Sequence, residues 1–124
     1  MVSIGRGGPK AGPRKGDVFV LEFPDIGGHV QSGHRPGVVV QADRLSSSGT
    51  AVLCPITSAP PRDELRRPHR VPVARTESGL DRDGWVKADQ LVTVPVTMLT
   101  GPVGRLAPAA LDRVDVALRF VLDL

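Results

Sequence analysis

The chain has 124 residues, with 16 Lys and Arg against 13 Asp and Glu, a formal net charge of +3 and a single Cys. Apolar residues make up 40% and charged residues 23%, which is typical of one globular domain and excludes a disordered chain. One Cys excludes an internal disulfide framework, and no apolar run approaches the roughly 18 residues that span a bilayer. We therefore expect a soluble, cytoplasmic protein with no signal segment near Met1.

The positive charge is concentrated in two parts of the chain. Residues 1–15 contain four basic residues and no acid, and residues 62–75 contain five Arg against two acids. From residue 80 onward, acidic residues slightly outnumber basic ones. This distribution favours a local site for an anionic ligand over a surface that is basic throughout.

Residues 1–13 are rich in Gly and Pro and show no hydrophobic period, so they predict a flexible basic N-terminal arm. Residues 14–124 are expected to form the single domain. Within it, runs rich in β-branched residues and bounded by turn residues predict short strands at 17–23, 37–42, 50–56, 69–73 and 85–94. The connecting segments are expected to be loops or turns, at 26–35, 57–67, 77–84 and 95–104.

An amphipathic helix of about four turns is predicted at the C-terminal end. It would follow Pro108, which suits a first helical turn, and its apolar face would consist of Leu111, Val114, Leu118 and Val121. Several short strands followed by one helix predict a mainly β protein, with a small, strongly bent antiparallel barrel. Its uncovered edge strands and small core favour a homodimer.

Few aromatic residues are available for stacking on bases. Phe19 and Phe23 are expected on the core face of the first strand, and Cys54 is expected to pack in the core. Trp85 is the one candidate for stacking, although a core role is the more frequent use of such a residue.

Six short blocks carry a resemblance to a known family. They are Arg14–Val18, Gly28–Pro36, Pro55–Ser58, Lys87–Leu91, Gly104–Leu106 and Val114–Leu118. In this order and at this spacing, the chain resembles the MazF/PemK family of toxin endoribonucleases from bacterial type II toxin–antitoxin systems. The resemblance covers about Arg14 to Leu124.

The resemblance implies the SH3-like small barrel of the CcdB/MazF toxins, paired as a homodimer. It also implies cleavage of single-stranded RNA, including mRNA, without a metal or other cofactor. The 2′-hydroxyl would attack the adjacent phosphorus and leave a 2′,3′-cyclic phosphate and a 5′-hydroxyl. A cognate MazE-like antitoxin with an acidic, partly disordered tail would neutralise the activity.

The same resemblance indicates five catalytic candidates. Arg35 offers a fixed fork for two phosphate oxygens, and Thr57 stands where a buried strand breaks into a polar loop. Lys87 and Asp89 are two apart on a predicted strand and would share one face, either as acid and base or as an exposed salt bridge. His29, in the first loop, matches a helper residue of one branch of the family, in which an Arg stands at the position of Lys87.

Four further positions are expected to contact RNA. Asp17 and Gln31 match family positions that touch bases or phosphates, although a turn Asp and a loop Gln also have structural uses. Ser58 places a second hydroxyl near the phosphate, and Gln90 is expected to order the loops by hydrogen bonding. Val30 departs from the family, which usually has Glu there.

A metal site is not expected, because one Cys and three scattered His match no ligand spacing. Two other functions remain open. One is a non-catalytic toxin of the same fold that binds a protein such as a topoisomerase, and the other is a simple RNA-binding SH3-like module. The pairs Arg35-Pro36 and Thr57-Ser58 favour the nuclease.

Overall fold

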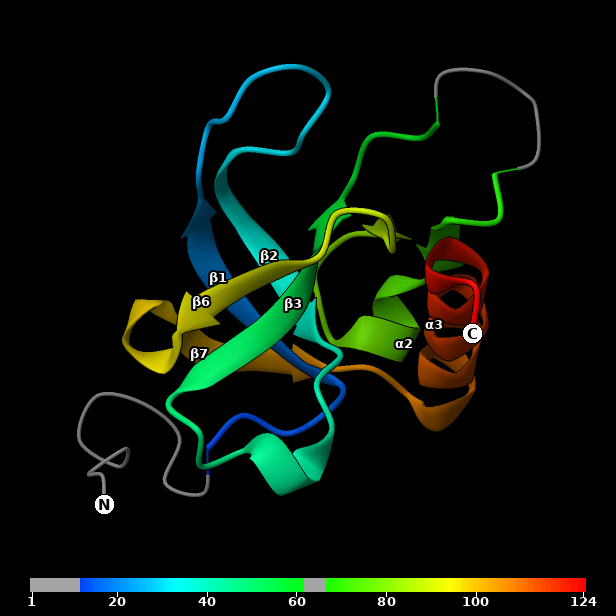
Figure 1. Cartoon of the computed structure of the whole chain (residues 1–124). Helices are drawn as coiled ribbons and strands as arrows, with labels where there is room; N and C mark the ends of the chain where they lie inside the picture. Colours follow the sequence, from blue (N-terminus) through cyan, green and yellow to red (C-terminus); the bar gives the residue numbers. More distant parts are fainter. Residues whose placement is uncertain (1–11, 62–66) are drawn as a thin grey trace.

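The structure, a computed structural model, describes residues 12–61 and 67–124. In these residues the chain forms a seven-stranded, strongly curved antiparallel sheet with one long helix beside it (Figure 1). The strands are β1 Asp17–Phe23, β2 Gly33–Val39, β3 Thr50–Thr57, β4 Arg70–Val73, β5 Gly84–Lys87, β6 Val92–Pro95 and β7 Thr100–Arg105. The helical segments are η1 Asp43–Leu45, α2 Arg75–Ser78, η2 Val96–Met98 and α3 Pro108–Leu122.

The strands of this sheet bury apolar side chains on both faces. Phe19, Leu21 and Phe23 of β1 pack in one cluster, whereas Val18 packs in a second cluster beneath α3. The sequences of β1 and β3 are therefore almost continuously apolar, because each strand supplies both clusters. The burial predicted for Phe19 and Phe23 is confirmed, with exposures of 0% and 2%.

The predicted C-terminal helix is confirmed as α3, which begins at Pro108. Ala110, Val114 and Ala117 are buried, and Leu111, Leu118 and Val121 pack partly against the same cluster. On its flank, Arg113 donates from Nη2 to the carbonyl of Pro72 at 3.3 Å and to both oxygens of Glu77 at 2.8 and 2.9 Å. This one guanidinium ties α3 to α2 and to β4.

β3 lies at the centre of the sheet that carries the site. The sheet order is β4-β5-β3-β2-β1-β7, and β6 also pairs with β3. One edge of β3 pairs with β2, where Gly37 lies opposite Pro55. The other edge pairs with β6 along Thr50–Leu53 and with β5 at Ile56–Thr57. The last residue of β3 is therefore placed between the start of β2 and the start of β5.

The continuous strand predicted at 85–94 is wrong, because β5 ends at Lys87 and β6 begins at Val92. Both pieces follow the same edge of β3. Val86 of β5 pairs with Ile56, and Val92 of β6 pairs with Leu53. Val86 and Val92 are six residues apart in the sequence, whereas their partners on β3 are only three residues apart. Three residues are therefore looped out between the two strands. The sequence gives no Pro or Gly signal for this interruption.

Two boundaries differ from the sequence prediction on the other side of the sheet. β2 begins at Gly33, earlier than predicted, because Phe23 at the end of β1 pairs with it. Arg35 consequently lies on a strand, opposite Leu21, and not in a loop. The predicted irregular segment 95–104 contains most of β7, which pairs with the free edge of β1.

Residues 1–11 of the predicted arm lie outside the described residues. Gly12 and Pro13, at its end, are buried, and the carbonyl of Pro13 accepts a bond from Ser46 Oγ at 2.9 Å. The packed part of the chain thus includes two residues assigned to the arm. The packing role of Cys54 is confirmed, since it is fully buried and burial raises the pKa of its thiol to about 12.

No helix in the described ranges is long and apolar enough to cross a membrane.

Gly104 tests how closely α2 approaches β7. A Cβ at this position would lie 2.2 Å from the carbonyl oxygen of Ser78, so Gly104→Ala has to push α2 away. We expect this variant to lose about 1–3 kcal/mol of unfolding free energy, measured by urea denaturation. The neighbouring change Val103→Ala, at a position 43% exposed, should stay within about 0.5 kcal/mol of the parent. Equal stability of the two variants would contradict the close approach.

Candidate functional site

A hollow lies where β2 begins and β3 ends. Its volume is about 160 Å³, and it is open to solvent. β2, the end of β3 and the segment before β5 line it, with His34, Arg35, Pro36, Ile56, Thr57, Ser58, Leu80, Asp81, Arg82, Asp83 and Gly84. The structure therefore brings together Arg35, Thr57 and Ser58.

Arg35 is exposed and anchored at its inner end, because its Nε donates to the carbonyl of Ser32 at 3.2 Å. Thr57 is only 6% exposed, and its Oγ1 accepts a bond from the amide of Ala59 at 3.1 Å. A hydroxyl that accepts such a bond still carries a proton to donate. The pair thus presents a fixed cation and a positioned hydroxyl donor at one hollow.

A hydrogen-bond network links the looped-out turn to the loop after β1. The amide side chain of Gln90 accepts from the backbone N–H of Gln31 at 2.7 Å and donates to the carbonyl of His29 at 3.1 Å. The Nζ of Lys87 donates to Gln31 Oε1 at 2.6 Å. The predicted ordering role of Gln90 agrees with this geometry, in which one neutral amide uses both its donor and its acceptor.

Lys87 is a partly buried cation among other charges. Burial lowers the pKa of its ammonium, the positive charge of Arg70 lowers it further, Asp89 opposes this, and Arg35 adds to the lowering. Arg35, Arg70 and Asp89 therefore all lie close enough to Lys87 for their charges to affect its pKa. An ammonium with a lowered pKa gives up its proton more readily than an ordinary Lys.

Asp89 lies in the turn after β5, so the expectation that it shares one strand face with Lys87 is wrong. Its carboxylate instead accepts a bond from Nη1 of Arg70, on the neighbouring strand β4. The side chain of Arg70 is 16% exposed and that of Asp89 is 37% exposed. Sequence reasoning did not single out Arg70, although the five Arg of residues 62–75 pointed to this part of the chain.

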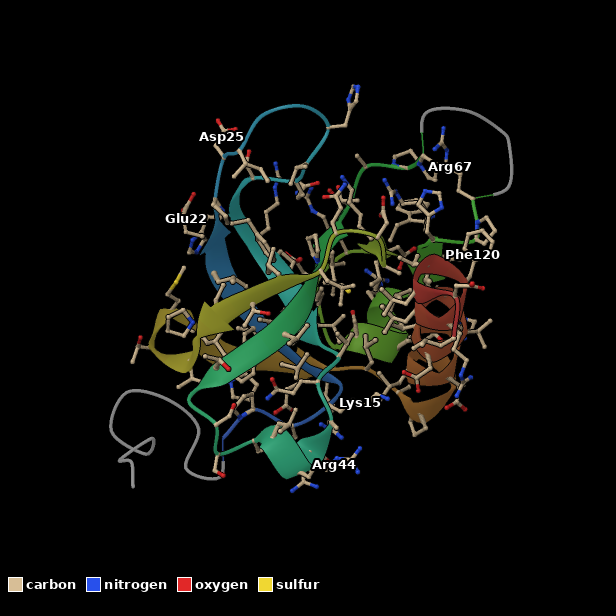
Figure 2. The ribbon with its side chains drawn as sticks, in the orientation of Figure 1. Lys15, Glu22, Asp25, Arg44, Arg67 and Phe120 are labelled. Carbon is tan, nitrogen blue, oxygen red and sulfur yellow. The ribbon has the colours of Figure 1, made fainter. Side chains whose placement is uncertain are left out.

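Asp17 lies at the opposite end of β1 from the hollow. Its Oδ1 accepts from Nη1 of Arg105 at 2.7 Å, and its Oδ2 accepts from the backbone N–H of Arg14 at 2.9 Å. Figure 2 shows the neighbouring Lys15 far from Asp25, which marks the end of the molecule that holds the loop after β1. The structure does not bring Asp17 to the other site candidates.

The remaining candidates differ in how firmly they are placed. His29 is exposed, and it is its carbonyl that takes part in the network. The hollow also contains three charged residues, Asp81, Arg82 and Asp83, from a segment predicted only as a turn. Asp83 accepts a bond from the N–H of Arg75 at 2.8 Å and so caps α2. In the sequence, the only sign that this segment lines a site is the run of three charged residues, Asp81-Arg82-Asp83.

Residues 12–61 and 67–124 contain no group of three or more His, Cys, Asp or Glu side chains that could hold a metal ion.

The fold and this site define a small antiparallel β protein with a C-terminal helix and with a polar hollow, lined by Arg35 and Thr57 among others, where β2 begins and β3 ends. Residues 14–122 match the family described as PemK-like, MazF-like toxin of type II toxin–antitoxin system. The chain belongs to this family, and the mainly β fold expected from its sequence is confirmed.

Relatives with known names agree with this membership. The chain is 30% identical over 114 residues to Endoribonuclease MazF9 of Mycobacterium tuberculosis, covering 90% of this chain and 97% of the relative. It is 30% identical over 112 residues to Endoribonuclease EndoA of Bacillus subtilis, covering 90% and 95%.

Solved structures show the same fold. The crystal structure of MazF from Deinococcus radiodurans superposes with a TM-score of 0.71 at 24% identity, covering 90% of this chain and 97% of that one. An endoribonuclease from a mycobacterial species, in complex with its cognate antitoxin, superposes with a TM-score of 0.72 at 23% identity, covering 90% and 96%.

Gln90 provides a test of the network. Gln90→Ala removes both bonds to the loop, so the amide of Gln31 should exchange its hydrogen at least about tenfold faster, as loss of one buried bond implies. Gln90→Glu keeps the acceptor for that amide and loses the donor to His29, so its effect should be smaller. Hydrogen exchange measured residue by residue compares the three proteins, and identical rates at Gln31 would show that Gln90 does not hold the loop.

Proposed function

We propose that this chain is a metal-independent endoribonuclease toxin that cleaves single-stranded RNA, including mRNA, in the cytoplasm and is neutralised by a cognate MazE-like antitoxin. The observation that carries the proposal is the meeting of Arg35 and Thr57 at one open hollow. Two relatives that match nearly the whole chain are named endoribonucleases, which supports the reaction class. The structure of an endoribonuclease relative with its cognate antitoxin supports the partner.

The reaction begins when the 2′-hydroxyl attacks the adjacent phosphorus, and negative charge then grows on the non-bridging oxygens. The guanidinium of Arg35 binds two of these oxygens through its fork, and the hydroxyl of Thr57 donates to the same phosphate. Arg35 acts by charge and hydrogen bonding only, because a guanidinium does not deprotonate in proteins. Ser58, at the same hollow, adds a second hydroxyl.

Two proton transfers complete the cleavage. Asp89 accepts the proton of the 2′-hydroxyl, and Lys87, whose pKa is lowered, donates a proton to the departing 5′-oxygen. The products are a 2′,3′-cyclic phosphate and a 5′-hydroxyl. Gln31 and Gln90 hold the loop after β1 against the turn that follows β5. His29, in that loop, assists the cleavage, as in the family branch that has a His at this position.

We also infer a homodimer. The outer face of α3 exposes two apolar side chains one turn apart, Val116 at 62% and Phe120 at 61%, and Leu124, 86% exposed, follows just beyond the end of the helix. Figure 2 shows Phe120 on the side of the molecule that faces away from the sheet. A second copy that covered this strip would remove it from water.

Arg35→Ala tests the nuclease. Loss of one donor to the transition-state charge should lower the cleavage of mixed RNA at least about a hundredfold, with EDTA present throughout. The readout is the amount of fragments that end in a 2′,3′-cyclic phosphate. Arg44→Ala, which removes an exposed Arg at the opposite end of the molecule, should cleave as the parent does (Figure 2).

Three outcomes count against the proposal. Full cleavage by folded Arg35→Ala refutes the role of this residue. Binding of RNA without fragments favours a simple RNA-binding module. Neither binding nor fragments favours a toxin that acts on a protein.

A further inference from the structure

Two cations face each other at the β4–β5 pair. In the register of these strands Arg70 lies directly opposite Lys87, which places both side chains on one face of the sheet. Like charges in such a pair destabilise a sheet unless an anion lies between or beside them. The position therefore favours a bound negative charge.

Asp89 supplies part of that charge but not all of it. Its carboxylate contacts Nη1 of Arg70, and both side chains retain access to solvent. A guanidinium carries five N–H donors in a fixed fork, so one carboxylate contact does not exhaust it. The group consists of Lys87 and the three side chains whose charges act on it, Arg70, Arg35 and Asp89. It therefore contains three positive charges and one negative charge.

The same sheet face leads from this pair to the reaction hollow. Across the sheet, β2, β3, β5 and β4 follow one another and carry Arg35, Thr57, Lys87 and Arg70 in that order. Strands are spaced by about 4.8 Å, so the strands that carry the two Arg lie roughly 14 Å apart across the sheet. Arg70 is also offset along the strands by two residues, because it pairs with Lys87 whereas Thr57 pairs with Trp85. Two long side chains shorten this span from both ends, which leaves room for two neighbouring phosphates.

We propose that Arg70 binds the phosphate that follows the scissile one on its 3′ side, so that Lys87 lies between the two phosphates, beside the departing 5′-oxygen. This second phosphate subsite rests on the proposed function. Asp89 orients the guanidinium from one side, and the phosphate approaches the donors that remain. In this position Arg70 acts on binding of the leaving strand and does not touch the scissile phosphate.

Short chimeric substrates test the subsite. A single ribonucleotide in an otherwise deoxy strand fixes the cleaved bond, because only that residue has a 2′-hydroxyl. In the parent protein, adding one 3′ phosphodiester to such a dinucleotide should raise kcat/KM about tenfold, as one charge-assisted hydrogen bond implies. Arg70→Gln should lose this gain. Because Arg70 also contacts Asp89 and lowers the pKa of Lys87, this variant should slow cleavage of the dinucleotide and of the strand extended only on the 5′ side, both by the same factor, and cleavage of the 3′-extended strand by about tenfold more.

Arg70→Lys and Arg44→Gln are the matched variants. Arg70→Lys keeps the charge without the fork, so it should retain part of the gain. Arg44→Gln removes the same charge at the other end of the molecule and should retain all of it. If Arg70→Gln slows the dinucleotide and the 3′-extended strand by the same factor, so that the full 3′ gain remains, the subsite is refuted; a loss of thermal stability alone assigns Arg70 to a structural ion pair with Asp89.

Binding of an all-deoxy strand, which cannot be cleaved by this route, separates this proposal from the nuclease itself. The slope of log Kd against log salt concentration should fall by about 0.7 in Arg70→Gln, the value for one phosphate contact on a single strand. If the parent protein cleaves nothing but this slope still changes, the nuclease fails and the phosphate site stands. If the slope is unchanged, the phosphate site fails whatever the protein cleaves.

Discussion

The site depends on the register of β3 with its neighbours. Gly37 opposite Pro55, and Thr57 opposite Trp85, bring the ends of three strands to one hollow. A shift by one residue would turn Thr57 to the other face of the sheet, because side chains alternate along a strand. The apolar side chains that β3 buries in both clusters prevent such a shift, since it would also expose the core. Packing and site geometry are thus set by the same strand pairing.

Neutral groups, and not acids, hold the loop after β1 beside Lys87. The loop after β1 contacts Lys87 through the neutral amide of Gln31, and the neighbouring residue is the apolar Val30. Gln90, also neutral, fixes the loop. An acid in either place would orient the loop as well but would cancel a cation. Neutral amides keep the loop ordered and leave the cations to an incoming phosphate.

Local patterns predicted those features that depend on neighbouring residues. The spacing of Leu111, Val114 and Leu118 predicted α3, and the apolar run before Phe23 predicted β1. The interruption after Lys87 escaped prediction because it is set by how β5 and β6 share one edge of β3, a constraint between distant segments.

The site shows the same division between local and distant constraints. Arg35 and Thr57 were predicted to converge from the motifs that contain them, and the hollow brings them together. Arg70 was not singled out, because its place opposite Lys87 follows from strand pairing across a loop and leaves no mark in the local sequence. Asp17, chosen by resemblance, lies at the other end of β1.

The contact of Arg113 with β4 bears on how the chain behaves when many copies are present. β4 is an outermost strand, and such strands can pair with a strand of another molecule. Pro72, inside β4, has no N–H to offer, and its carbonyl is occupied by Arg113. A foreign strand therefore meets no donor and an acceptor already in use at this point, which disfavours intermolecular growth of the sheet past β4.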